Sequence, residues 1–170
     1  VHFGPHLDTW ATYFGAPFTH GTPFRRAREE NLFLDDASMH VGIRGPVYSR
    51  DDLKNDERFG VKIIHCDEFQ SQGTDKIAER IRNRVGNNPL YLSIDIDVLD
   101  PAFAPGTGTP EIAGMTTREM VNVLRGLSGL NLISADVVEV SPAYDHAEVT
   151  SLAAATIVYE LTNLFAKKKQ

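Results

Sequence analysis

The chain has 170 residues, of which 42% are hydrophobic and 24% are charged, and its formal net charge is -6. This length and composition suit one globular domain with a core of its own. The acidic balance argues against a nucleic-acid binder, which would normally carry a basic face. From the sequence we expect no membrane span, because no apolar run approaches the required length, and the single cysteine, Cys66, excludes an internal disulfide. We expect Cys66 to be a buried, structural residue.

Five segments have the composition of buried strands, rich in Val, Ile and Leu. They are residues 1–3, 39–44, 61–67, 89–97 and 132–140. Strands that alternate with helices predict a mostly parallel sheet covered on both faces. We therefore expect a three-layer α/β/α fold, with residues 1–170 forming a single domain.

Helical patterns occupy the intervals between these strands. The predicted helices cover residues 22–31, 49–59, 74–85, 116–127 and 148–169. Ile77, Ile81 and Val85 recur every four residues and mark the buried face of one helix. Thr116 and Glu119 have the spacing of a capping box, which indicates where the next helix begins.

Acidic and imidazole side chains gather where the predicted strands end. The segment SIDIDVLDP carries Asp95 and Asp97, which should lie on one side of a strand because strand side chains alternate. His6 and Asp8 follow the first strand at the same spacing, and Glu139 ends the last one. Function collects at the carboxyl ends of parallel strands, so we expect these groups to share one rim of the sheet.

Two carboxylates held close together in a buried strand need a positive partner. One imidazole and several carboxylates suit Mn²⁺ or Mg²⁺ better than the thiolate sites of structural zinc. Taken singly, His6 is more readily interpreted as a strand-end residue, and Asp8 as a turn residue or helix cap. The two paired motifs together favour a metal site.

Longer stretches resemble the C-terminal part of a ureohydrolase, the family of arginases, agmatinases and guanidinobutyrases. The matching stretches are SIDIDVLDPAFAPGTGTPE (93–111), HGTPFRRA (20–27), VGIRG (41–45) and VVEVSPAYD (137–145). The resemblance is nearest to the agmatinase and guanidinobutyrase branch. It implies manganese-dependent hydrolysis of agmatine, or alternatively guanidinobutyrate, to urea and an amine by a hydroxide that bridges two Mn²⁺ ions.

The resemblance also implies roles for individual residues. Four residues match the family's metal ligands: His6, Asp8, Asp95 and Asp97. His20 matches a histidine that shuttles protons at the mouth of the cleft, and Glu139 matches the carboxylate that binds the substrate guanidinium. Such enzymes generally form trimers or hexamers, so we expect a homo-oligomer that acts on a small guanidino compound, without nucleic acid or membrane.

Two of these residues also have plainer interpretations. His20, followed by Gly and Thr, would fit a loop before a helix. Glu139 could pair with an arginine, for which the chain offers Arg25, Arg26 and Arg44. From the residues alone, both interpretations stay open.

The chain departs from the family pattern at the first ligand motif. That motif normally reads Asp-Ala-His-x-Asp, whereas this chain has glycine at position 4, where a bridging carboxylate is expected. A further histidine ligand, from an earlier Gly-Gly-Asp-His segment, is not in the sequence. We therefore expect at most one weakly held manganese ion, and a gain in affinity from Gly4→Asp in a longer chain that includes the missing N-terminal part. A second hypothesis is a catalytically impaired homologue that acts as a binding or regulatory subunit.

The sequence begins with Val1 in what resembles a strand, so we expect the chain to start inside a domain. Any targeting segment would then lie outside it. The compartment is left open between cytoplasm and mitochondrion.

Overall fold

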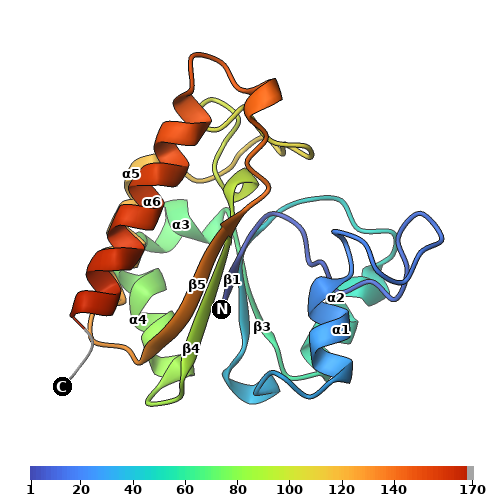
Figure 1. The fold of residues 1–170 in the computed structure, drawn as a ribbon. Coiled ribbons are helices and arrows are strands. Elements are labelled where there is room, and N and C mark those ends of the chain that lie inside the picture. Colours follow the sequence, from blue (N-terminus) through green and yellow to red (C-terminus); the bar gives the residue numbers. More distant parts are fainter. Residues whose placement is uncertain (168–170) are drawn as a thin grey trace.

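The computed structural model describes residues 1–167, which are built around a five-stranded sheet (Figure 1). Its strands are β1 (His2–Phe3), β2 (Met39–Ile43), β3 (Lys62–His65), β4 (Leu90–Asp95) and β5 (Leu132–Val138). Their order across the sheet is β3-β2-β1-β4-β5, and every neighbouring pair is parallel. The five predicted strands are confirmed, with shorter bounds.

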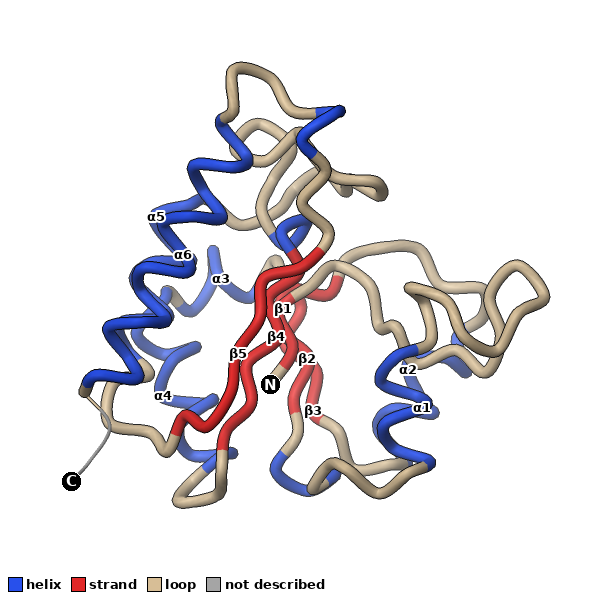
Figure 2. Tube along the Cα trace, viewed as in Figure 1, coloured by secondary structure: helices blue, strands red, loops and turns tan. Residues whose placement is uncertain are grey.

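Helices cover both faces of the sheet. They are α1 (Pro23–Glu29), α2 (Arg50–Arg58), α3 (Glu68–Gln72), α4 (Thr74–Val85), α5 (Thr117–Gly126) and α6 (Val149–Ala166). Figure 2 shows α3 to α6 on one side of the sheet and α1 and α2 on the other, which confirms the predicted three-layer fold. The short helix α3 was not predicted, and the predicted end of the last helix at 169 lies outside the described residues.

Local sequence signals account for the helix starts and for the buried helix faces. The Thr116 side chain accepts a hydrogen bond from the Glu119 amide (3.1 Å), and the Glu119 carboxylate accepts one from the Thr116 amide (2.7 Å). This capping box begins α5 as predicted. On α4, Ile77, Ile81 and Val85 are buried in the core, so their four-residue spacing does mark its inner face.

Strand β4 separates the apolar core from a polar face of the sheet. Leu92 and Ile94 are completely buried in the core, under the layer that contains α4, α5 and α6. The alternate residues Tyr91, Ser93 and Asp95 line a cleft on the opposite face. The chain leaves β1 toward one edge of the sheet and β4 toward the other, so the β1–β4 junction is the topological switch point at which α/β sheets bind ligands.

One prediction about this strand end is wrong. β4 ends at Asp95, and Ile96–Val98 form a 3₁₀ turn, so Asp95 and Asp97 do not alternate along one strand face. The Asp95 carboxylate accepts a hydrogen bond from the Asp97 amide (3.2 Å) and caps that turn. The two carboxylates are brought together by a tight turn instead of by the pleat.

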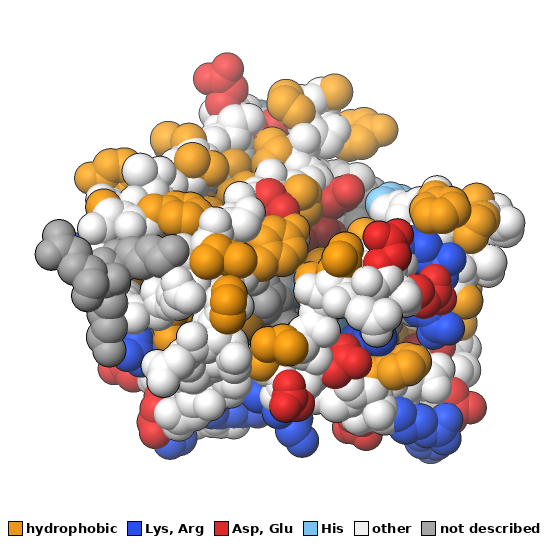
Figure 3. Space-filling view, turned by 60° about the horizontal axis from the view of Figure 1, so that its bottom comes forward, with side chains coloured by type: hydrophobic (Ala, Val, Ile, Leu, Met, Phe, Trp, Pro, Cys, Tyr) orange, Lys and Arg blue, Asp and Glu red, His pale blue; other side chains and the backbone are white. Residues whose placement is uncertain are grey.

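The side of the molecule formed by β5 and α6 exposes many hydrophobic side chains (Figure 3). β5 is an edge strand whose Ile133 is 55% exposed, and on α6 Leu152 and Tyr159 are 68% and 65% exposed. Contrary to the sequence expectation, α6 is long and apolar enough, with a mean hydropathy of 1.3, to cross a membrane by length and composition alone. It packs against β5 and α5, as a helix that covers a sheet does.

Arg44, directly after β2, holds together the loops at the carboxyl edge of the sheet. Its guanidinium donates hydrogen bonds to six backbone carbonyls, those of residues 42, 97, 98, 99, 111 and 112. The shortest, to the carbonyls of Asp97 and Glu111, are both 2.7 Å. Arg44 therefore fixes the turn that carries Asp97 against the loop that carries Glu111.

We expect Arg44→Lys to destabilise the protein by about 2–4 kcal/mol, because one ammonium group cannot satisfy the carbonyls that a planar guanidinium reaches. The measurement is the free energy of unfolding in urea. The matched control is Arg118→Lys on the exposed face of α5, which should leave it nearly unchanged. An equal effect from both variants would contradict the role given to Arg44.

Candidate functional site

A cleft of about 280 Å³ opens at the carboxyl edge of the sheet, over β1, β4 and β5. The loop between β1 and α1 forms its outer wall, with Trp10 and Tyr13 stacked at a ring distance of 5.1 Å. Imidazole and carboxylate groups dominate its polar lining: His2, His6, Asp8, His20, Asp95, Asp136 and Glu139.

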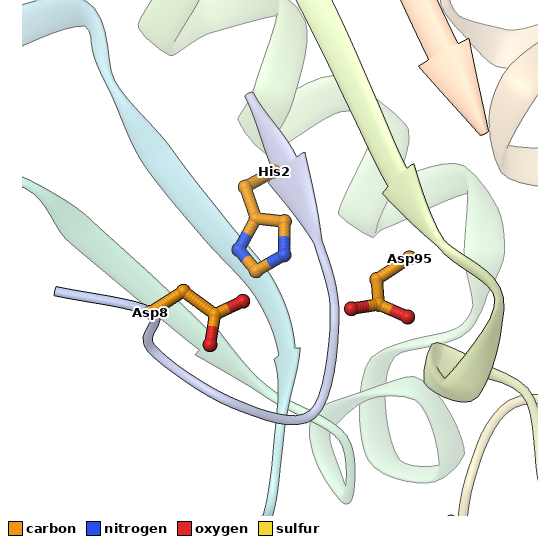
Figure 4. A group of neighbouring side chains, drawn as sticks. All are labelled: His2, Asp8 and Asp95. Carbon is orange, nitrogen blue, oxygen red and sulfur yellow. The ribbon is translucent and has the colours of Figure 1, made fainter. Parts of the chain in front are cut away.

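Three of these groups converge at the β1–β4 junction. The ligand atoms of His2, Asp8 and Asp95 all lie within 4.8 Å of one another. Figure 4 shows the His2 ring between the two carboxylates, which point toward it from either side. Asp8 reaches this position through a left-handed backbone conformation (φ 53°), which costs roughly 1–3 kcal/mol and is found mostly at functional sites.

A second group of donors surrounds Asp97. His6 Nδ1 lies 3.4 Å from Asp97 Oδ2, and His6 Nε2 lies 3.4 Å from Glu111 Oε1. The Thr109 hydroxyl donates a hydrogen bond to the same Asp97 oxygen (3.2 Å). Asp97 is 1% exposed, yet its other oxygen, Oδ1, has no hydrogen-bond partner among the described residues.

An unpartnered carboxylate oxygen in a buried position is costly unless a cation or a donor satisfies it. Here it belongs to a site with three further candidate ligands, His6, Asp8 and Asp95, all oxygen or imidazole donors. Such donor sets suit Mn²⁺ and similar hard divalent ions. By donor chemistry, the residues present fit a divalent metal centre.

The protonation equilibria show how strongly these groups need a cation. Burial, and then the neighbouring Asp97, raise the pKa of Asp95 to about 10, and burial raises the pKa of Asp8 to about 7. Burial lowers the pKa of His6, but hydrogen bonding to Asp97 and the nearby carboxylates outweigh it and raise that pKa above 6.5. Burial also lowers the pKa of His2 well below 6.5, so this imidazole is neutral.

The structure places the other two predicted site residues at the rim of the same cleft. His20 is exposed on the outer-wall loop, with its ring 5.1 Å from that of Tyr13. Glu139 directly follows β5 in a left-handed conformation (φ 64°), which turns it out of the strand. Thus His6, Asp8, Asp95, Asp97, His20 and Glu139 are brought to one edge of the sheet, while their catalytic and ligand roles stay predictions.

The arginines offered as partners of Glu139 are engaged elsewhere. Arg25 and Arg26 pair with Glu29 on α1, and Arg44 binds backbone carbonyls. Within residues 1–167, Glu139 has no arginine partner. Its carboxylate is therefore available to a ligand in the cleft.

The space beside Gly4, where the family pattern has a carboxylate, is occupied by the ring of His2. This ring also lies close to Asp95, and none of the motifs in the sequence pointed to His2 as a residue of the cleft. Alternation along β1 could have found it, because residues 2 and 4 share one face of a strand. Thr109 and Glu111 were also missed, since their contacts depend on how the GTGTPE loop folds back over Asp97.

Comparison with known proteins shows which protein family the chain belongs to. The model of the arginase family matches residues 1–163, nearly the whole chain. The chain belongs to the arginase family. The resemblance to ureohydrolases drawn from the sequence motifs is thereby confirmed, together with the fold class.

Individual relatives agree with this family assignment. The chain is 51% identical over 168 residues to guanidinopropionase from Pseudomonas aeruginosa, covering 98% of this chain and 53% of that protein. It is 45% identical over 170 residues to agmatinase from Photorhabdus laumondii subsp. laumondii, covering 100% of this chain and 52% of the relative. This arginase-family chain therefore spans about half the length of the curated relatives it matches.

The solved structure of the proclavaminate amidino hydrolase from Streptomyces clavuligerus superposes with a TM-score of 0.92 at 42% identity. The match covers 99% of this chain and 55% of that one. The arginase-family fold of this chain therefore corresponds to about half of a complete relative, and by family the chain is an amidinohydrolase homologue.

Proposed function

We propose that the protein to which this chain belongs hydrolyses a small guanidino compound to urea and an amine with Mn²⁺ as cofactor. Agmatine is the first candidate substrate. The observation that carries the proposal is that Asp8 and Asp95 meet at the carboxyl edge of the sheet, where His6 contacts Asp97 and the buried Asp97 has one unpartnered carboxylate oxygen. When bound, divalent cations lower the pKa of a water molecule and orient it as a nucleophile.

The chain's own residues supply substrate binding and proton transfer. The Glu139 carboxylate accepts two parallel hydrogen bonds from the planar guanidinium and so orients its carbon in the cleft. Water adds to this carbon and the bond to the alkyl nitrogen breaks. The departing amine needs a proton, and His20 at the rim is suited to carry it, because an imidazole changes its charge near neutral pH.

The lining of the cleft favours a cationic substrate. Within residues 1–167, it contains acidic, imidazole and aromatic side chains but no lysine or arginine. A second positive group, as in agmatine, suits acidic groups and the faces of Trp10 and Tyr13. A substrate that ends in a carboxylate would meet no lysine or arginine among the described residues that line the cleft. Guanidinopropionate is nevertheless the second candidate, because the 51% identical relative is a guanidinopropionase.

The direct test is urea release by the manganese-loaded chain with agmatine, guanidinopropionate and guanidinobutyrate. We expect turnover with a preference for agmatine. A preference for either carboxylate substrate would overturn the substrate assignment and leave the hydrolase standing. A folded, manganese-loaded chain without turnover would favour the alternative of an impaired, regulatory homologue.

His20→Gln should lower kcat by about 10²- to 10⁴-fold, the usual contribution of general acid–base catalysis. It should leave manganese content unchanged, because His20 stands apart from the metal-site groups. The measurement is kcat with agmatine together with metal analysis of the purified variant. His65→Gln, on β3 outside this cleft, is the control and should keep the activity of the unmodified chain.

We also propose that the chain associates with copies of itself, as a trimer or hexamer. The exposed hydrophobic side chains of β5 and α6 support this, because monomeric proteins rarely expose large apolar patches. Light scattering after size-exclusion chromatography measures the oligomeric state, and a monomer at micromolar concentration would contradict the proposal.

A further inference from the structure

The His2 ring occupies the space in which a side chain at position 4 would lie. A Cβ atom on Gly4 would sit 2.4 Å from His2 Nε2 and 2.6 Å from His2 Cε1, which no real Cβ tolerates. The same atom would sit 3.5 Å from Asp95 Cβ. The ring thus keeps its place beside Asp95 only because residue 4 has no side chain.

The ring is held in this place from two sides. Its Nδ1 atom lies 2.9 Å from Nδ1 of His40 on the neighbouring strand β2, and its ring centroid lies 4.5 Å from that of Phe24 in a tilted arrangement. His2 is 4% exposed. With Nδ1 engaged by His40, Nε2 is the nitrogen left for the space between Asp8 and Asp95 (Figure 4).

We propose that His2 is a metal ligand and that its Nε2 atom replaces the donor that Gly4 lacks. This inference rests on the metal site proposed above. The ligand atoms of His2, Asp8 and Asp95 lie within 4.8 Å of one another, close enough to share one ion. One imidazole and two carboxylates form a donor set that Mn²⁺ accepts.

The contact with His40 then has a defined role. His2 donates its Nδ1–H to Nδ1 of His40, which leaves the lone pair of His2 Nε2 directed toward the two carboxylates. Metal-binding histidines generally donate their second N–H to an acceptor, which fixes both tautomer and ring orientation. His40 is therefore a positioning residue for His2.

The first experiment is a Mn²⁺ titration of the full 170-residue chain and of His2→Phe. Phenylalanine keeps a ring against Phe24 and removes both nitrogens. Loss of an outer-shell partner alone costs about 10- to 100-fold in metal affinity, so loss of the ligand should weaken binding by at least that factor. The control is His65→Phe on β3, which should bind Mn²⁺ like the unmodified chain. Unchanged affinity in folded His2→Phe would overturn the proposal.

Position 4 provides a second, independent test. Gly4→Ala adds no ligand and meets no backbone strain, because Gly4 is not in a positive-φ conformation. Its methyl group must displace the His2 ring, so we expect Mn²⁺ affinity to fall. The double variant His2→Ala/Gly4→Asp exchanges imidazole for carboxylate and should bind more tightly than His2→Ala alone. Gly4→Ala binding Mn²⁺ as well as the unmodified chain would contradict the steric argument.

A spectroscopic measurement needs no folding comparison. Electron spin-echo modulation of the Mn²⁺-loaded chain should show nitrogen couplings from two imidazoles, those of His2 and His6. Couplings from His6 alone would overturn the His2 assignment.

If Asp95→Ala weakens Mn²⁺ binding and His2→Phe does not, the proposed metal site stands and only the ligand role of His2 is wrong. If the unmodified chain binds no Mn²⁺, both proposals fall.

Discussion

Asp95→Asn should make the metal-free protein more stable and abolish its saturable Mn²⁺ binding. Asparagine keeps the size of the side chain and the acceptor for the Asp97 amide. It removes a buried acid whose pKa is raised to about 10 by burial and by Asp97. We expect a gain of about 1–3 kcal/mol at neutral pH, or roughly 3–10 °C in Tm.

The raised pKa of Asp95 also predicts how Tm changes with pH. As the pH rises above about 4, the unfolded chain releases the Asp95 proton while the folded chain retains it, so stability falls with rising pH. The fall continues toward pH 10 for Asp95 and ends near pH 7 for Asp8, whose pKa is about 7. In Asp95→Asn the dependence should be shallower above pH 7.

Calorimetry of the metal-free proteins measures both effects, and Asp36→Asn is the control. Asp36 is exposed in the turn before β2, so its variant should follow the unmodified chain. Mn²⁺ at one hundred times its Kd should increase the free energy of unfolding of the unmodified chain at pH 8 by about 2.7 kcal/mol and so raise its Tm. It should not raise the Tm of Asp95→Asn. A destabilised Asp95→Asn would show that the carboxylate is already compensated by the protein.

Glu139→Gln should lower kcat/KM for agmatine by about 10²- to 10³-fold, the equivalent of roughly 3–4 kcal/mol. The amide keeps the shape of the side chain but loses its charge and one of two acceptor oxygens. No arginine within residues 1–167 neutralises the native carboxylate, so its charge is available to the guanidinium. Manganese content should stay unchanged.

Steady-state urea release and isothermal titration with agmatine measure the effect of Glu139→Gln. Glu57→Gln on the exposed face of α2 is the matched control and should bind and turn over agmatine normally. If Glu139→Gln lost manganese instead of agmatine affinity, Glu139 would belong to the metal site and not to the substrate site.

Much of the fold follows from local patterns in the sequence. The four-residue spacing of Ile77, Ile81 and Val85 predicted the buried face of α4, and the Thr116–Glu119 pair predicted the start of α5. Both signals are local, because they depend on one turn of helix and its unpaired amides. The structure confirms both predictions almost residue by residue.

The residues of the candidate site could be predicted from the sequence, but part of the site's geometry could not. The carboxyl-edge rule brought Asp95 and Asp97 to the same rim as His6 and Asp8, as the structure has them. The 3₁₀ turn after β4 was not predictable from alternation, because a side-chain cap ended the strand early.

Contacts between segments far apart in the chain were the least predictable part. The approach of Glu111 to His6 joins residues 105 positions apart, and Arg44 binds carbonyls up to 68 positions away. His2 is a partial exception, because strand alternation places it on the same face as position 4. Only the structure shows that its ring fills the space that a side chain at Gly4 would need.

The proposed divalent metal site consists of imidazole and carboxylate groups on β1 and β4 and just beyond their carboxyl ends, at the switch point of the sheet. Equilibrium dialysis of metal-free, folded chain against Mn²⁺ at pH 8 tests it most directly. We predict saturable binding of one ion per chain, lost in Asp95→Asn and kept in Asp36→Asn. Binding that never saturates, or that is equal in all three proteins, would contradict the claim.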